Sequence, residues 1–205
     1  TAWKTPWTKQ PRLLLPSFFN MKTCGLYFGS FNPFHIGHIA IVNYLVSFTT
    51  LDSVRLVVSP LNPLKSDREP CLQSPRERLL HIRKVMETKK LPVEVSDVEF
   101  FLPRPLYTIN TLHHMQEKEP GMDFILVIGA DNLERIEEWK AWESILEEFI
   151  LYVYPREGVN TQQISEKYVS RARQIVLLPA PLITVSSTFI REGLAQGKNM
   201  NGFIV

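Results

Sequence analysis

Two histidines, His35 and His38, flank Gly37 at the point where an apolar run gives way to an amphipathic stretch. The run covers residues 24–28 and the stretch covers residues 39–46, a pattern that predicts a strand, a tight turn and a helix. The spacing of three places both imidazoles on one face of the helix, and the glycine lets a ligand approach the backbone. Because helix N-terminal amides and imidazole N–H groups both bind phosphate, this segment predicts a phosphate site.

These histidines allow two other interpretations, packing in the core and metal binding. A lone histidine on an apolar helix face is more often a packed core residue than a catalyst. Packing does not explain a pair around a glycine, directly after a strand and a Gly-Ser-Phe-Asn-Pro turn, so we favour function. The remaining histidines, His81, His113 and His114, have no cysteine or carboxylate cluster at zinc-ligand spacing beside them. We therefore expect no metal ion held by the protein alone.

Length and composition indicate one domain. The chain has 205 residues, of which 44% are hydrophobic, enough for one sizeable core. No apolar run approaches the roughly 20 residues that span a bilayer, so we expect a soluble protein without a membrane partner. Two cysteines, Cys24 and Cys71, favour a reducing cytoplasm over a disulfide framework, and either could be a buried small hydrophobe.

Residues 1–20 differ from the rest of the chain, because their tryptophans and prolines follow no helical or strand period. We expect a non-native or disordered leader that ends just before Met21, with a targeting peptide as the alternative. This stretch holds three of the 23 basic residues and no acid, so without it the formal charge changes from +2 to −1. The apparent basicity then gives no reason to expect a nucleic-acid partner.

Short apolar runs alternate with stretches of helical period along residues 21–205. This alternation predicts an α/β fold, namely a Rossmann-like, doubly wound, mainly parallel sheet with helices on both faces, in a single domain. Ligands of such folds lie beyond the carboxyl ends of the strands. Strands are predicted at 24–28, 54–58, 93–95, 124–128, 149–153 and 175–178, and helices at 75–86, 108–116, 162–172 and 187–195.

Two segments at predicted strand ends carry further groups suited to a nucleotide. A proline-rich loop after the second strand leads to Lys65, which suits a phosphate clamp, although an ordinary surface lysine would look the same. Gly129 and Asp131 end the central strand. Glycine permits close approach of a ring or ribose and aspartate accepts hydrogen bonds from hydroxyls, while a plain Asp-Asn turn is the alternative.

The last predicted helix begins with hydroxyl side chains. Ser186 or Ser187 is expected to cap it, with Thr188 beside them and Arg191 one turn inside. Capping alone would explain the serines. Free amides, hydroxyls and an arginine on the neighbouring turn also make a second phosphate cradle, which we expect to face the histidine pair.

Residues 35–38 resemble the HxGH motif of the nucleotidyltransferase superfamily. The same letters spell the HIGH motif of class I aminoacyl-tRNA synthetases. Those enzymes carry a lysine-rich KMSKS loop, which is absent from this sequence, and the chain is too short for an anticodon-binding module.

Five motifs in order over residues 21–205 resemble the nicotinate-nucleotide adenylyltransferases. Residues 104–112 are similar to the family's Ser-Tyr-Thr-x-Asp-Thr-Leu motif, with Leu106 in place of serine and Asn110 in place of aspartate. Residues 185–191 are similar to its Ile-Ser-Ser-Thr-x-Ile-Arg motif. In the family, Tyr-Thr lies against the pyridine ring and its carboxylate, and a tryptophan stacks on that ring.

The resemblance implies a set of site residues. The residues implied to bind nicotinate mononucleotide are Tyr107, Thr108, Trp139 and Arg156. The neighbouring Trp142 could instead be purely a core residue, and the alternative for Arg156 is an ordinary exposed arginine. Those implied to bind ATP are Gly29, Ser30, Phe31, His35, His38, Gly129, Asp131, Ser186, Ser187, Thr188 and Arg191. The catalytic set comprises His35 and His38, which would stabilise the transferred phosphate, and Lys65 and Arg191, which would hold pyrophosphate.

The implied reaction is adenylyl transfer from ATP to nicotinate mononucleotide, with Mg²⁺ carried by the ATP. Two alternatives stay open. A sister enzyme would act on nicotinamide mononucleotide or phosphopantetheine, and a catalytically silent nucleotide-binding module would fit Asn32, which replaces the family's usual aspartate. The sequence also leaves open whether the protein forms a homo-oligomer and whether a final C-terminal helix of the family is missing.

Overall fold

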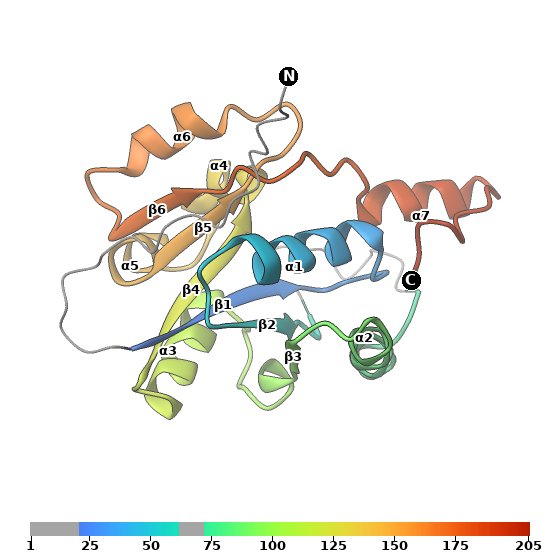
Figure 1. Ribbon diagram of the computed structural model, residues 1–205, viewed down its shortest axis with the longest axis horizontal. Helices are drawn as coiled ribbons and strands as arrows, with labels where there is room; N and C mark the ends of the chain where they lie inside the picture. The colour runs from blue at the N-terminus through green and yellow to red at the C-terminus, as the bar shows by residue number, and fades with distance from the viewer. Residues whose placement is uncertain (1–20, 62–71) are drawn as a thin grey trace, which may run out of the picture.

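The computed structural model describes residues 21–61 and 72–205. Six parallel strands form one sheet in the order β3-β2-β1-β4-β5-β6, and helices follow the strands along the chain (Figure 1). The predicted α/β, doubly wound fold is confirmed. The strands are β1 (Lys22–Gly29), β2 (Ser53–Val58), β3 (Val93–Ser96), β4 (Met122–Gly129), β5 (Ile150–Tyr154) and β6 (Gln174–Leu177).

Local capping chemistry sets several helix starts. The hydroxyl of Ser74 accepts a bond from the Glu77 amide at 3.3 Å, and the Glu77 carboxylate accepts one from the Ser74 amide at 2.8 Å, before Pro75 begins α2. The helices are α1 (Ile36–Phe48), α2 (Pro75–Lys89), α3 (Thr108–Lys118), α4 (Ala130–Glu134), α5 (Trp142–Glu148), α6 (Thr161–Tyr168) and α7 (Ser187–Ala195).

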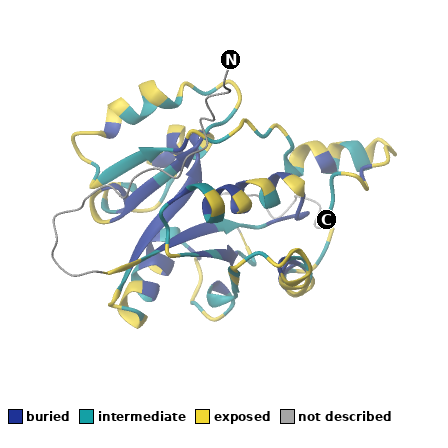
Figure 2. Cartoon of the chain, in the orientation of Figure 1, coloured by how far each residue is buried: buried dark blue, intermediate teal, exposed yellow. Residues whose placement is uncertain are grey.

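Two clusters of buried apolar residues cover the two faces of the sheet. Figure 2 shows the central strands largely in the colour of buried residues. On one face, side chains of α3, α4 and α5 pack against strand residues such as Leu26 and Leu126. On the other face, α1 and α2 pack against Tyr27 and Val127, the next residues along the same strands. Because side chains alternate along a strand, each strand serves both layers, as a sheet buried on both faces requires.

The strand register brings several loops to one edge of the sheet. Gly29 at the end of β1 pairs with Val58 at the end of β2, and Gly129 at the end of β4 pairs with Tyr154 at the end of β5. The connections from β1 lead toward β2 and β3, whereas β4 lies on the other side of β1, so the winding reverses between β1 and β4. A ligand site is expected beyond the carboxyl ends of these strands.

The last residues of the chain return to the start of α1 (Figure 1). The amide of Ile36 donates to the carbonyl of Phe203 at 3.0 Å, and His35 forms an isolated antiparallel bridge with Ile204. His81 on α2 donates to the carbonyl of Val205. Backbone pairing therefore supports the turn that carries the two histidines.

Some predicted elements were wrong in extent. The helix predicted over 162–172 ends at Tyr168, because Arg173 turns the chain into β6 by donating its amide to Leu146 at 2.7 Å and by pairing with Asp123 at 3.0 Å. The short helices α4 and α5 were not predicted, since five and seven residues give too little helical period to recognise. Thr108 is the first residue of α3, as predicted, and Tyr107 holds the N-cap position without a capping side-chain bond.

Several predictions concern residues outside the described part of the chain. The leader at 1–20, Cys71 and Lys65 all lie there. Cys24 lies in β1, where it is a fully buried free thiol and burial raises its pKa. No helix among the described residues has the length and apolar character needed to cross a bilayer.

Candidate active site

Residues 35–38, the histidine turn, cap the start of α1 through bonds among themselves. His35 is the N-cap residue, and its Nδ1 accepts a bond from the Gly37 amide at 3.1 Å. The Nδ1 of His38 accepts a bond from the His35 amide at 3.2 Å, and the two rings stack with centroids 3.6 Å apart. Because both Nδ1 atoms act as acceptors, a neutral ring carries its proton on Nε2. Two Nε2–H donors therefore remain for a ligand.

Burial keeps both rings neutral. It is the main cause that lowers the pKa of His35 to about 4, and the nearby Arg156 guanidinium lowers it further. The pKa of His38 lies well below its ordinary value for the same reason, with contributions from His35 and Arg156. At neutral pH the pair offers hydrogen-bond donors without carrying full positive charge.

The start of α7 is bonded directly to the loop before α1. Ser186 caps the helix by accepting a bond from the Phe189 amide at 3.1 Å, as one of the two predicted caps. Ser187 donates to the carbonyl of Pro33 at 3.2 Å. Arg191 donates to the carbonyl of Asn32 at 2.8 Å, and to the Thr188 hydroxyl at 3.2 Å. Two segments more than 150 residues apart in the chain thus lie together.

A polar network lies at the carboxyl ends of β4 and β5. Arg156 pairs with Asp131, with 3.3 Å from Nε to Oδ1, and donates to the Tyr154 hydroxyl at 3.0 Å. The hydroxyls of Tyr154 and Tyr27 are 3.5 Å apart. Gly129 makes the arrangement possible, because a Cβ at this position would lie 2.2 Å from Oδ1 of Asp131. The network therefore joins Asp131, implied to bind ATP, with Arg156, implied to bind the mononucleotide.

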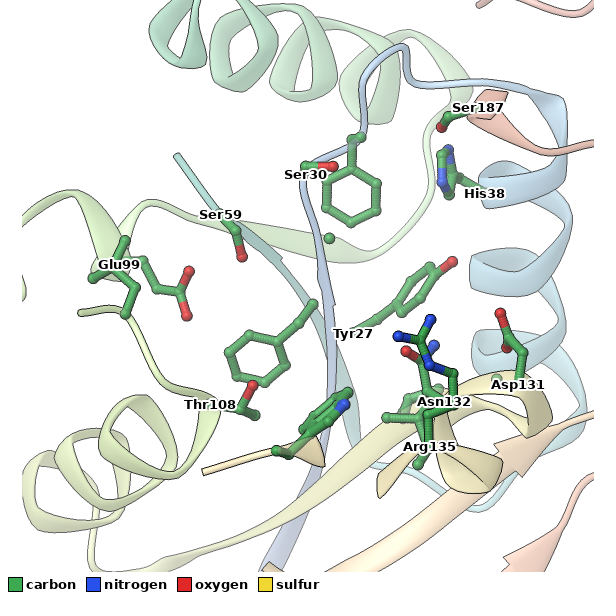
Figure 3. Close-up of a pocket in the computed structure, with 18 of the residues that line it drawn as sticks. Tyr27, Ser30, His38, Ser59, Glu99, Thr108, Asp131, Asn132, Arg135 and Ser187 are labelled. Atoms are coloured by element: carbon green, nitrogen blue, oxygen red, sulfur yellow. The ribbon is translucent and has the colours of Figure 1, made fainter. Parts of the chain in front are cut away.

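The opposite end of the cleft lies at the start of α3. Tyr107 and Thr108 begin this helix, whose first amides have no acceptor within the helix itself. Glu99 lies beside them, is only 3% exposed and accepts a bond from the Thr111 hydroxyl at 2.9 Å. Figure 3 shows Glu99, Ser59 and Thr108 on one side of Tyr27, with His38, Ser187 and Asp131 on the other.

One cleft of about 1380 Å³ connects the histidine turn, the start of α7, the polar network around Arg156 and the start of α3. Arg191 stands behind its wall, and Lys65 lies outside the described residues. The implied site residues that line the cleft are Gly29, Ser30, Phe31, His35, His38, Tyr107, Thr108, Gly129, Asp131, Trp139, Arg156, Ser186, Ser187 and Thr188.

Sequence reasoning missed several residues that shape the cleft. Arg78 on α2 is buried and donates to the carbonyls of Ser30, Ser59 and Pro60, which fixes the ends of β1 and β2 relative to each other. The sequence signal that could have identified Arg78 is an arginine on the apolar face of a predicted helix. The lining residues that were not predicted include Tyr27, Ser59, Glu99, Arg104, Asn132, Arg135, Glu138, Lys140 and Tyr154.

Comparisons with known proteins agree with this geometry. The family model described as cytidylyltransferase-like matches residues 26–193. A Flavobacterium psychrophilum protein named "probable nicotinate-nucleotide adenylyltransferase" is 43% identical, over 86% of this chain and 88% of its own length. A Bacteroides thetaiotaomicron protein of the same name is 39% identical, over 90% of this chain and 88% of its own length. The chain belongs to the nicotinate-nucleotide adenylyltransferase family.

A solved structure supports the fold of this family member. Nicotinic acid mononucleotide adenylyltransferase of Plasmodium falciparum, complexed with NaAD, matches with a TM-score of 0.74 and covers 89% of this chain and 90% of that one. Its sequence identity is 18%, so the likeness shows a shared fold. The resemblance inferred from the motifs is confirmed by the more similar bacterial relatives.

Lowering the pH from 8 to 5 is expected to reduce the free energy of unfolding of this adenylyltransferase. Buried His35 and half-buried His38 have pKa values below those in the unfolded chain, so the unfolded state takes up protons first. The stability gained from neutral rings is complete above pH 6.5 and is lost as the pH falls toward 4. For His35 alone, the pKa of about 4 predicts a loss of about 2 kcal/mol at pH 5.

Urea unfolding at several pH values measures this loss. Asparagine can replace the N-cap function of His35 but does not titrate, so His35→Asn is expected to flatten the pH dependence. Equal slopes in the wild type and the variant would contradict the assignment of the low pKa to His35.

Proposed function

We propose that this protein transfers the adenylyl group of ATP to nicotinate mononucleotide, which gives nicotinate adenine dinucleotide and pyrophosphate in NAD biosynthesis. The observation that carries the proposal is one continuous cleft that contains the histidine pair, the α7 start and the Tyr107-Thr108 helix start. Membership of the nicotinate-nucleotide adenylyltransferase family supports it.

The chemistry requires positioning more than proton transfer. The mononucleotide phosphate attacks the α-phosphorus of ATP, an O–P bond forms, and the bond to the α–β bridging oxygen breaks as pyrophosphate leaves. The nucleophile is already ionised, so no general base is needed. The Nε2–H groups of His35 and His38 would donate to the α-phosphate oxygens as negative charge builds on them.

The ATP half of the cleft would use backbone and hydroxyl groups. The amides and hydroxyls at the start of α7 face the cleft through Ser186, Ser187 and Thr188. Arg191 would hold this helix start in place from behind the cleft wall through its bonds to Asn32 and Thr188, and Lys65 would hold the departing pyrophosphate. Gly29, Ser30, Phe31, Gly129 and Asp131 would line the nucleoside end of the same half.

The other half would hold the mononucleotide. Tyr107 and Thr108 present the helix start of α3, where amides and a partial positive charge favour the carboxylate of the acid. Trp139 is half-buried on the cleft wall, where it can stack on the pyridine ring. Arg156 lines the same cleft and pairs with Asp131, and it would lie near the mononucleotide.

We propose that Mg²⁺ enters with the triphosphate. Among the described residues no three or more His, Cys, Asp or Glu side chains gather as a metal site, and Asp131 in the cleft pairs with Arg156. These side chains fit a Mg²⁺ ion that is held by the phosphate oxygens of ATP, where the ion would offset negative charge on the triphosphate. We also place the protein in the cytoplasm, a location supported by the free thiol of Cys24.

Pyrophosphate release from ATP and Mg²⁺ tests the proposal. Nicotinate mononucleotide, nicotinamide mononucleotide and phosphopantetheine are offered side by side, and the highest kcat/KM is expected with nicotinate mononucleotide. A preference for either other acceptor would replace the proposed substrate with that of a sister enzyme. ATP binding without release from any acceptor would indicate a silent nucleotide-binding module.

A further inference from the structure

Glu99 is a buried carboxyl group in the wall of the cleft, and no cationic side chain among the described residues pairs with it. Its side chain comes from the short 3-10 turn Val98–Phe100 between β3 and α3, and the residue is 3% exposed. Oε1 accepts the bond from Thr111 and the Ser59 hydroxyl also acts on the carboxylate, whereas Oε2 has no bond of hydrogen-bond geometry among the described residues. A buried carboxyl oxygen without a partner is costly, so a function for it is expected.

The other carboxylates of the cleft differ from Glu99 in having cationic partners. Asp131 pairs with Arg156 at 3.3 Å and Glu138 pairs with Arg135 at 2.6 Å. Glu99 forms no ion pair within the part of the chain that the structure describes. Burial raises the pKa of Glu99, and the hydroxyls of Ser59 and Thr111 only partly oppose that shift. A ligand that brings positive charge would therefore be stabilised at this position.

We propose that Glu99 is a binding and specificity residue that recognises the positive charge of the pyridinium ring of the mononucleotide. This inference rests on the proposed function. The ring nitrogen of nicotinate mononucleotide is bonded to ribose, so the ring is a cation while its substituent is a carboxylate. The start of α3 suits the carboxylate and Glu99 suits the ring, and the Thr111 bond fixes these two groups relative to each other.

The test compares two forms of one ligand. Nicotinate mononucleotide has a cationic ring, and its 1,4-dihydropyridine form has nearly the same shape with a neutral ring. Calorimetric titration of the wild type without ATP is expected to give a Kd about tenfold lower for the cationic form, as a charge interaction in a buried setting predicts. Equal Kd values for the two forms with the wild type would overturn the proposal without any variant.

Glu99→Gln keeps the size and the acceptor for Thr111 but removes the charge. It is expected to abolish the preference for the cationic ring and to raise the KM for the mononucleotide about tenfold, with the KM for ATP unchanged. The same exchange at exposed Glu87 on α2 is the matched control and should keep the preference. Glu99→Asp retains a negative charge and should keep part of the preference.

The outcomes separate the two proposals. A Glu99→Gln variant that still prefers the cationic ring as strongly as the wild type would refute the role of Glu99, while adenylyl transfer by the wild type would leave the proposed function standing. Equal loss of preference in the Gln and Asp variants would show that packing, not charge, is responsible. Failure of the wild type to bind nicotinate mononucleotide at all would count against both proposals.

Discussion

Replacing His38 with alanine is expected to lower kcat for adenylyl transfer by about 10²–10³-fold, the range found when one donor to a developing negative charge is removed. His38 is one of two imidazoles whose Nδ1 is already used by the backbone, so its Nε2–H is the group available to the α-phosphate. The KM for ATP should change only a few-fold, because the interaction strengthens mainly in the transition state. Steady-state pyrophosphate release measures both constants.

Two further variants separate catalysis from folding. Asparagine at position 38 offers an oxygen that can accept a bond from the His35 amide but has no group at the Nε2 position. His38→Asn should therefore lose kcat to the same extent as His38→Ala yet stay close to the wild type in thermal stability. Histidine 114 on α3 does not line the cleft, and His114→Ala should retain activity. Near-normal kcat in both His38 variants would remove His38 from the mechanism.

Replacing Gly37 with alanine is expected to lower kcat/KM by at least about 10²-fold, because small misplacements of catalytic groups have effects of this size. A Cβ at position 37 would lie 2.9 Å from two atoms of the His35 ring and 2.9 Å from the carbonyl oxygen of Val185. The backbone oxygen cannot rotate away, so the histidine turn and the chain leading into α7 must move apart. The expected overpacking cost of about 1–3 kcal/mol should also lower Tm by several degrees.

Gly121 provides the matched control for this substitution. A Cβ at position 121 meets no atom within 4 Å, so Gly121→Ala should leave both activity and Tm close to the wild type. The Gly37 effect is specific if only that variant loses activity. Full activity of Gly37→Ala would mean that the histidine turn and the start of α7 do not need the close approach seen in the structure.

Local signals in the sequence were sufficient for much of the fold. Ser74 and Pro75 mark the start of α2, and the helix predicted over 187–195 is α7 with the same bounds. The buried strand β4 follows from an unbroken apolar run. Elements that depend on distant contacts were less predictable. The end of α6 depends on the pairing of Arg173 with Asp123, which are 50 residues apart, and no local pattern records that contact.

The residues of the candidate site also divide into those that local motifs predict and those whose role depends on distant contacts. Ordered motifs predicted the residues of the histidine turn, the α7 start and the α3 start, and the structure places them around one cleft. The sequence did not reveal that Arg156 pairs with Asp131 or that it lowers the pKa of both histidines. Glu99 was missed because an acidic residue in a short turn has no distinguishing pattern. Its burial and its unpartnered oxygen exist only in the folded chain.

A crystal structure with nicotinate adenine dinucleotide bound would test the central claim most directly, namely that both halves of the reaction share this cleft. The adenylyl phosphate is predicted within hydrogen-bond distance of the Nε2 atoms of His35 and His38, with the adenosine end toward α7. The pyridine ring is predicted between Trp139 and the start of α3. A dinucleotide bound elsewhere, or with its phosphates beyond reach of both imidazoles, would contradict the account.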